Sequence, residues 1–140
     1  MSAGKRLIIP PASVIVADVD KLKATNDARG HAAGDELLRH AASVLQSTFR
    51  AADVLARIGG DEFAILLPYT DAVTVEQIVS RVRERLTEHN LQYPDLRVQL
   101  SLGAATAEQS NLTRAFTVAD QCMYADKSAR QANANHSPAA

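Results

Sequence analysis

The chain has 140 residues, a formal net charge of −1, 46% apolar residues and 22% charged residues. These values fit one soluble globular domain with a real core, and a net charge near zero gives no bulk electrostatic basis for binding nucleic acid or a membrane. A single cysteine excludes an internal disulfide and a cysteine-based zinc site. No apolar run approaches about 20 residues and the first residues lack the apolar core of a signal peptide, so we expect a cytoplasmic protein.

The first part of the chain predicts a lead-in followed by a buried strand. Residues 1–12 contain two consecutive prolines, so they are not expected to form an element. The continuous apolar run over residues 14–17 is typical of a strand covered on both faces. It ends in Asp18-Val19-Asp20, which places acids at the carboxyl end of the strand, where open α/β sheets tend to bind ligands.

The spacing of apolar residues predicts the remaining elements in chain order. They are a short helix over 21–27, a turn over 30–35, a long helix from 36 to about 49, a hairpin over 54–67, a second long helix over about 71–86, a turn over 90–95, a strand over 97–102 with one polar face, a loop over 105–111 and a last helix to about 130. Cys122 belongs to the apolar pattern of that last helix, so we expect it to be packed. The small, polar tail over 131–140 is expected to be disordered.

This order predicts a single α/β domain over residues 13–130 with a mixed central β-sheet flanked by helices. The hairpin carries Gly59-Gly60-Asp61-Glu62 at its turn, where we expect the glycines to supply positive φ. Taken alone, such a string is most often a solvated turn. If the first strand lies beside the hairpin, strands about 4.8 Å apart let Asp18 and Asp61 reach one cation. Two carboxylates and a backbone carbonyl suit Mg²⁺, which keeps waters and recruits phosphate oxygens.

Three further side chains extend this hypothesis, each with a plainer alternative. Lys23 would neutralise phosphate charge, or it is an exposed helix lysine. Asp35 can accept from the N1–H and exocyclic amine of guanine while Asn26 both donates and accepts, or the two are an N-cap and a helix C-terminal residue. His31, between two glycines, is most often a turn residue.

Several segments together resemble the GGDEF-domain diguanylate cyclase family. They are the run over residues 18–35, similar to the pattern D-x-D-x-F-K-x-x-N-D-x-x-G-H-x-x-G-D; Gly59-Gly60-Asp61-Glu62-Phe63; Ser101-Leu102-Gly103; and residues 119–127, similar to A-D-x-x-x-Y-x-x-K. The match covers roughly residues 14–130 in the family's order and spacing, and several motifs in register are far more specific than one.

The resemblance implies a palm-like α/β fold and condensation of two GTP into cyclic di-GMP with release of two pyrophosphates. It assigns the metal, Mg²⁺ with Mn²⁺ as an alternative, to Asp18, Asp61 and the carbonyl of Val19. Asp61 would accept the proton of the attacking 3′-hydroxyl with Glu62 assisting. The remaining substrate contacts implied are Asn26, His31 and Asp35 to guanine, Lys23 and Lys127 to phosphates, and the turn glycines Gly59 and Gly60. Each domain would bind one GTP, so two chains must face each other as a homodimer.

Arg50-Ala51-Ala52-Asp53 fits the family's R-x-x-D motif, five residues ahead of the glycine pair. In the family this motif is an allosteric inhibitory site for the product, and Arg81 matches a position where some members supply a secondary arginine. Arginine pairs bidentately with phosphate or guanine, and aspartate accepts from guanine's donors. We therefore expect cyclic di-GMP to inhibit through Arg50 and Asp53.

The chain also departs from the family pattern. Leu22 replaces the usual Phe, Gln131 stands where a phosphate-binding Arg is expected, with Arg130 one position earlier as a substitute, and residues 1–13 lack the leading D-x-L-T-G-L-x-N-R segment. The upstream sensory module that members normally carry is expected to be absent from this chain. The alternative to an enzyme is a catalytically weak or silent domain that binds GTP or cyclic di-GMP and signals through a partner.

Overall fold

A computed structural model describes residues 9–136, with side chains through residue 133. The elements are β1 (Ala12–Val19), α1 (Leu22–Arg29), α2 (His31–Thr48), β2 (Val54–Arg57), β3 (Glu62–Pro68), α3 (Ala72–Gln92), β4 (Leu100–Ala107) and α4 (Leu112–His136). This succession of strands and helices is the predicted one. In the described part of the chain, no helix is long and apolar enough to cross a membrane.

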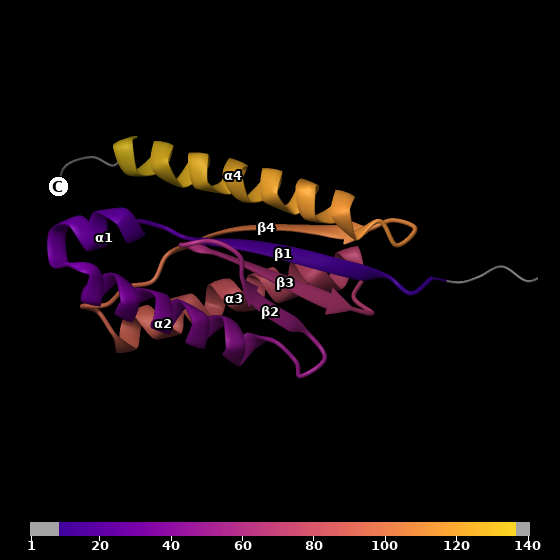
Figure 1. The fold of residues 1–140 in the computed structure, drawn as a ribbon, viewed down its shortest axis with the longest axis horizontal. Coiled ribbons are helices and arrows are strands. Elements are labelled where there is room, and N and C mark those ends of the chain that lie inside the picture. The colour runs from indigo at the N-terminus through magenta and orange to yellow at the C-terminus, as the bar shows by residue number, and fades with distance from the viewer. Residues whose placement is uncertain (1–8, 137–140) are drawn as a thin grey trace, which may run out of the picture.

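The four strands form one sheet in the order β2-β3-β1-β4 (Figure 1). The α/β class and the placement of β1 beside the hairpin are confirmed, but the prediction of a mixed sheet is wrong, because all three pairings are antiparallel. The physical reason is that an antiparallel strand lies between each pair of parallel strands. The α1–α2 crossover leads to β2, which runs parallel to β1, and the hairpin then folds β3 back between the two strands. Likewise β4 runs parallel to β3, but β1 lies between them.

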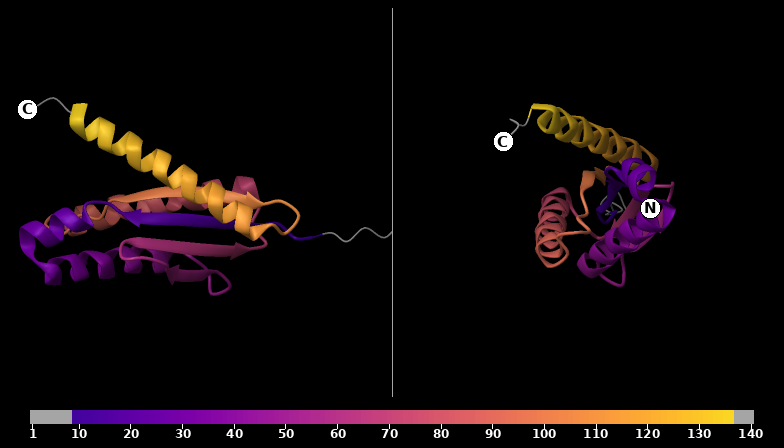
Figure 2. Two further views of the ribbon diagram at one scale, coloured as in Figure 1. Left: turned by 45° about the horizontal axis from the view of Figure 1, so that its top comes forward. Right: turned by 90° about the vertical axis from the view of Figure 1, so that its left-hand side faces the viewer.

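Side chains of the central strands alternate between two apolar layers. Ile15, Ala17 and Val19 face the larger layer, which α2 and α3 cover. Val14 and Val16 face the smaller layer, where they pack against Ala115, Ala119 and Met123 of α4. The two views of Figure 2 show α4 alone crossing one face of the sheet, opposite the other helices. By the same alternation Asp18 points to the α4 face.

The last third of the chain corrects four sequence predictions. β4 runs to Ala107, into the expected loop, and it has no polar face, because Ser101 is fully buried under α4. α4 continues to His136, past the end expected near Arg130 and into the expected disordered tail, of which residues 137–140 lie outside the described residues. Cys122 is exposed rather than packed, because the inward stripe of α4 runs through Ala115, Ala119 and Met123. Gly103 lets the α4 backbone approach β4 directly.

The two glycine-containing turns also differ from expectation. The predicted turn over residues 30–35 is mostly helix: α2 begins at His31, and Gly30, with φ 90°, is the single junction residue. Gly59 and Gly60 do not adopt positive φ, so the hairpin is not the expected tight turn. Its loop spans four residues and is closed by the amides of Ile58 and Gly59, which both donate to the carbonyl of Glu62.

Candidate functional site

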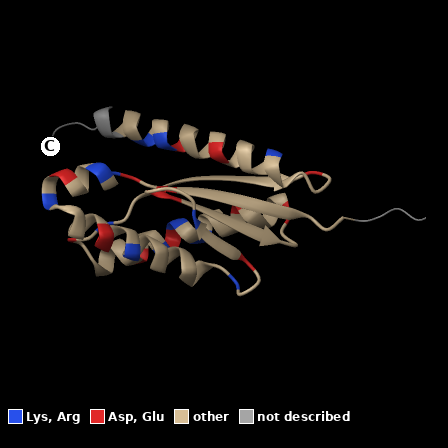
Figure 3. Cartoon of the chain, viewed as in Figure 1, with Lys and Arg blue, Asp and Glu red and all other residues tan. Residues whose placement is uncertain are grey.

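The acidic residues of β1 and the hairpin meet at one end of the sheet. Asp18 lies opposite Glu62 in the β1–β3 register, and the Val19 amide donates to the Asp61 carbonyl at 2.7 Å. Asp18 is only 5% exposed, although it carries a carboxylate. Figure 3 shows acidic and basic segments gathered where β1 ends and α1 begins. The predicted juxtaposition of the first strand and the hairpin acids is therefore present.

Lys127 of α4 is the cation that contacts this cluster. Its ammonium lies 3.3 Å from Asp18 Oδ1. Burial, followed by the negative charge of Asp61, raises the pKa of Asp18, and the Lys127 pair offsets only part of that rise. Burial by itself lowers the pKa of Lys127, but the charge of Asp18 and the hydrogen bond to it raise that pKa above its ordinary value. The site thus holds more negative charge than its own lysine neutralises.

Two further contacts of the acids were not predicted from the sequence. Asp20 is half-buried and accepts a hydrogen bond of 2.7 Å from Ser101 Oγ, and burial raises the pKa of Asp20. Burial and then hydrogen bonding to Asp120 of α4 raise the pKa of Glu62. The D-x-D string, the S-x-G motif and the A-D-x-x-x-Y-x-x-K motif contain Asp20, Ser101 and Asp120, but only the packing of α4 on the sheet shows which of these residues meet.

The donor set fits a hard divalent cation. Burial and then the negative charge of Asp61 raise the pKa of Asp18, and a nearby cation favours the ionised form of such a carboxylate. No group of three or more His, Cys, Asp or Glu side chains within residues 9–133 converges to form a complete metal cage. Two carboxylates and backbone oxygen would therefore need phosphate oxygens and water to complete the coordination, as Mg²⁺ sites commonly have.

The two predicted phosphate-binding lysines and an acid of the site line the same pocket. A pocket of about 380 Å³ is bounded by the end of β1, by α1, by the hairpin and by α4, and among its lining residues are Val19, Lys23, Asp61 and Lys127. A neighbouring pocket of about 400 Å³ has Asp20, Lys127, Arg130 and Gln131 along its wall. Arg130 also bonds Asp126 through Nε at 3.1 Å, so its guanidinium is partly engaged within α4.

The predicted guanine-reading residues lie around the start of α2. The Asn26 side chain packs over Gly34, where a Cβ would meet it, and Asn26 Oδ1 is buried without a hydrogen-bond partner. Asp35 is exposed, and with Phe63 it lines a groove of about 410 Å³ between α2 and the hairpin. His31 is exposed at the first position of α2, so it is not the turn residue that its flanking glycines indicated.

Arg57 is a positioning residue that sequence reasoning missed. Its Nε donates to the Gly59 carbonyl at 3.1 Å and its terminal nitrogen to the Gly60 carbonyl at 2.7 Å. These bonds hold the glycine turn without positive φ. Arg57 also lines the groove that contains Asp35, so one side chain connects the turn to that groove.

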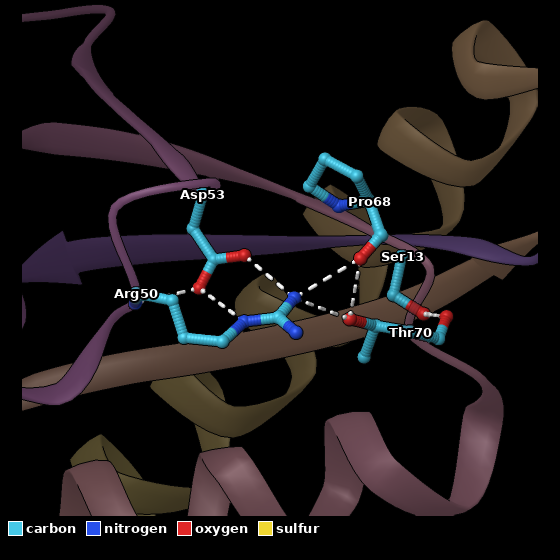
Figure 4. Close-up of polar contacts among 5 residues, drawn as sticks. All are labelled: Ser13, Arg50, Asp53, Pro68 and Thr70. Atoms are coloured by element: carbon cyan, nitrogen blue, oxygen red, sulfur yellow. Dashed lines mark hydrogen bonds and ion pairs between the residues drawn. The ribbon is translucent and has the colours of Figure 1, made fainter.

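The Arg50–Asp53 pair lies at the opposite end of the sheet from the acids. The Asp53 side chain is 1% exposed and accepts from the Arg50 backbone amide at 2.8 Å and from its guanidinium at 2.9 Å. The same guanidinium nitrogen donates to the Pro68 carbonyl at 3.0 Å and lies 3.2 Å from Thr70 Oγ1 (Figure 4). Arg81 is exposed on α3, and its side chain makes no hydrogen bond or ion pair to any other described residue.

An antiparallel sheet with helices on both faces, buried carboxylates beside lysines at one end, and a glycine turn next to a groove define an α/β domain with a polar, cation-compatible site. The model of the family described as diguanylate cyclase, GGDEF domain, matches residues 9–133. The chain belongs to the GGDEF-domain diguanylate cyclase family, which confirms the resemblance drawn from its motifs.

Known relatives agree with this assignment. Probable diguanylate cyclase DgcE of Escherichia coli (strain K12) is 38% identical over 119 residues, which is 82% of this chain and 11% of that protein. Diguanylate cyclase DosC of the same strain is 35% identical over 121 residues, 84% of this chain and 26% of that protein. The chain thus spans between about a tenth and a quarter of the length of these curated relatives.

Solved structures share the fold. The active GGEEF domain of a diguanylate cyclase from Vibrio cholerae superposes with a TM-score of 0.73 and 30% identity, covering 82% of this chain and 75% of that one. The GGDEF domain of DgcB from Caulobacter crescentus, solved in complex with c-di-GMP, gives a TM-score of 0.75 and 27% identity, covering 85% and 73%.

Proposed function

We propose that the chain condenses two GTP into cyclic di-GMP with release of two pyrophosphates. One observation carries the proposal: in a chain of this family, Asp18 and Asp61 meet at the end of β1, and Lys23 and Lys127 line the same pocket as Asp61. Opposite charges arranged in this way suit a triphosphate bound with a cation. The GGDEF domain of DgcB, with the same fold, was solved with c-di-GMP.

In the proposed reaction, the residues of this chain mainly position the two nucleotides and accept a proton. The 3′-oxygen of one GTP forms a bond to the α-phosphorus of the other, the α–β phosphoanhydride bond breaks, and pyrophosphate leaves. Asp61 accepts the 3′-hydroxyl proton with Glu62 assisting, and Lys23 and Lys127 bind phosphate oxygens. A divalent cation held by Asp18, Asp61 and the Val19 carbonyl, Mg²⁺ or alternatively Mn²⁺, would offset developing charge on the phosphates.

Substrate recognition is assigned to the α2 end of the site. Asp35 accepts from guanine's N1–H and exocyclic amine, and the buried, unpartnered Asn26 Oδ1 is an acceptor for a guanine donor. His31 lies in the same region, and the Arg57-supported backbone of Gly59 and Gly60 lets the nucleotide approach closely. Because one domain would hold one GTP, two chains must face each other for the reaction.

The deciding experiment incubates the chain at high concentration with GTP and Mg²⁺ and separates the nucleotides chromatographically. We expect cyclic di-GMP and pyrophosphate, with a rate that rises more than linearly with protein concentration because the dimer is the active form. Asp61→Asn should abolish the product, while the matched charge-removing control Asp95→Asn, at an exposed position, should not. Absence of cyclic di-GMP would favour the nucleotide-binding signalling module instead.

We further propose that cyclic di-GMP inhibits through Arg50 and Asp53, with Arg81 as a secondary contact. The pair is preorganised, because the buried Asp53 carboxylate orients the guanidinium of Arg50, whose side chain stays 56% exposed. Arg50→Ala should leave initial rates unchanged and remove inhibition by added cyclic di-GMP. The control Arg85→Ala removes an exposed arginine of α3 and should retain that inhibition. Inhibition that persists in Arg50→Ala at wild-type strength would refute this assignment.

A further inference from the structure

A second polar cluster lies at the outer edge of β4, where Arg83 of α3 reaches α4. Its centre is Asp126 of α4. Asp126 Oδ2 accepts from the Leu102 amide at 2.9 Å and from two guanidinium groups, Arg130 Nε at 3.1 Å and Arg83 Nη2 at 3.3 Å. The Asp126 side chain is 24% exposed and each arginine side chain is 39% exposed, so all three stay within reach of a ligand.

The strand edge itself adds a hydrogen-bond donor to this cluster. β4 has only β1 as a neighbour, and the Asp20 amide donates to the Gln99 carbonyl, so Gln99 bonds toward β1. Because the bonding direction alternates along a strand, the amides of Leu100 and Leu102 point to the outside. Asp126 accepts from the Leu102 amide, whereas no other described residue accepts from the Leu100 amide.

A pocket of about 230 Å³ opens beside this edge, between α3, the start of β4 and α4. Among the described residues that line it, only Arg83 and Arg130 are charged. The polar side chains of its wall are already engaged, since Thr87 Oγ1 donates to the Arg83 carbonyl and Asn90 bonds both backbone groups of Val98. The pocket therefore presents cationic donors and no carboxylate.

The two guanidinium groups share a single carboxylate oxygen. Burial raises the pKa of Asp126, but the Leu102 amide and the two arginines lower it below its ordinary value, so Asp126 is ionised at neutral pH. One anion thus faces two cations that repel each other, and a second anion bonded to both would offset that repulsion. Arg130 contacts Asp126 through Nε and Arg83 through Nη2, so each fork keeps donors that bond no other described residue.

We propose that Arg83, Arg130 and the Leu100 amide bind a phosphate group, with Asp126 as the residue that positions both arginines. Guanidinium forks match pairs of phosphate oxygens, and such charge-assisted hydrogen bonds are about twice as strong as neutral ones. A phosphate group accepts from several directions at once, as two forks and a strand edge require, whereas a carboxylate offers only two oxygens in one plane. The bound group ties α3 to α4 across the edge of β4.

This site is distinct from the pockets assigned to the nucleotide phosphates. Arg83 lines neither of those two pockets, and Lys127, which lines both, does not line this one. Arg130 lies between the site and the neighbouring pocket, where Asp20 feels its charge. Phosphate binding beside Arg83 therefore does not require the proposed reaction.

Titration of the ¹⁵N-labelled chain with inorganic phosphate, replacing chloride at constant ionic strength, tests the site by nuclear magnetic resonance. We expect saturable shifts of the Leu100 amide and of the Arg83 guanidinium signals. Arg83→Gln should weaken the affinity at least about tenfold, because a charge-assisted contact is lost. The control Arg85→Gln removes an exposed arginine of the same helix and should stay within about twofold of the wild type.

Further variants separate this site from other phosphate binding. Lys127→Gln should keep the wild-type affinity, and Arg83→Lys, which retains the charge without the fork, should weaken binding less than Arg83→Gln. Shifts of the Leu100 amide that do not saturate, or an equal affinity in the double variant Arg83→Gln/Arg130→Gln, would overturn the proposal. Parallel titrations with pyrophosphate and with ribose 5-phosphate distinguish a free anion from a phosphate ester, and tighter binding of either one supports the site.

Discussion

Gly103→Ala tests how closely α4 is pressed on the sheet. A Cβ at this position would lie 2.9 Å from the Cys122 carbonyl carbon, and closer still to the Ala119 carbonyl oxygen and the Met123 amide nitrogen. Favourable contacts between heavy atoms lie near about 3.5–4.0 Å, and all three atoms belong to the α4 backbone, so no rotamer change relieves the clash. The helix would have to withdraw by about 1 Å.

The cost follows from what α4 covers. Withdrawal loosens the packing of Ala119 and Met123 on Val14 and Val16. Overpacking costs about 1–3 kcal/mol, and we expect the upper end, near 3 kcal/mol, because backbone rather than side chain must move. With a urea m-value of about 2 kcal/mol/M, the unfolding midpoint should fall by about 1.5 M.

Equilibrium urea unfolding followed by far-UV circular dichroism measures this difference. Gly60→Ala is the matched control, since its Cβ would meet no atom within 4 Å and its φ is not positive, so its midpoint should change by less than about 0.3 M. If Gly103→Ala unfolds within that margin of the control with an unchanged m-value, the direct backbone contact between α4 and β4 is wrong.

Three further predictions concern the site and its surroundings. Burial raises the pKa of Asp18 above 3.8, so its stabilising contribution is present at low pH and is lost as pH rises through the raised value. The Tm of Asp18→Asn should therefore increase relative to the Tm of the wild type between about pH 4 and pH 7. A Tm difference that stays constant across that range would refute this prediction. Gly34→Ala would push the Asn26 carboxamide away, since Asn26 Cγ lies 2.7 Å from the new Cβ. If one hydrogen bond to guanine is lost, the affinity for GTP measured by calorimetry should fall about tenfold. An unchanged affinity would show that Asn26 does not contact guanine. Cys122 should react fully with a thiol reagent such as DTNB in the native chain, because it is exposed, whereas a reaction that needs denaturant would contradict that exposure.

Local sequence patterns were sufficient for the element types and their order. The apolar run of β1, the alternation on both sides of the glycine pair and the stripe of α3 depend on residues within one or two turns of each other, so periodicity reports them. The α3 N-cap is equally local, since Asp71 accepts from the Thr74 amide three residues on. The order and spacing of the motifs are also properties of the linear chain, and they were sufficient to identify the family.

Long-range packing decided what periodicity missed. Ser101 alternates with apolar residues and so looked exposed, but α4 covers that face and Asp20 accepts its hydroxyl hydrogen bond. Cys122 looked buried because it continues an apolar run, yet the narrow contact of α4 with small residues leaves it outside. The relative directions of neighbouring strands depend on β3 lying between β2 and β1, and no local sequence pattern carries that information.

The sequence by itself determined which residues carry charge, in which order the helices and strands follow one another, and that Asp18 and Asp61 each lie at the end of an apolar strand. The tertiary structure decided that these acids share one end of the sheet with Lys127, that Arg57 holds the glycine turn, and that Arg83 of α3 reaches Asp126 of α4. Lys127 lies 109 positions from Asp18 and Asp126 lies 43 from Arg83. Only the through-space pairing of strands and the packing of helices bring such distant side chains within hydrogen-bonding distance.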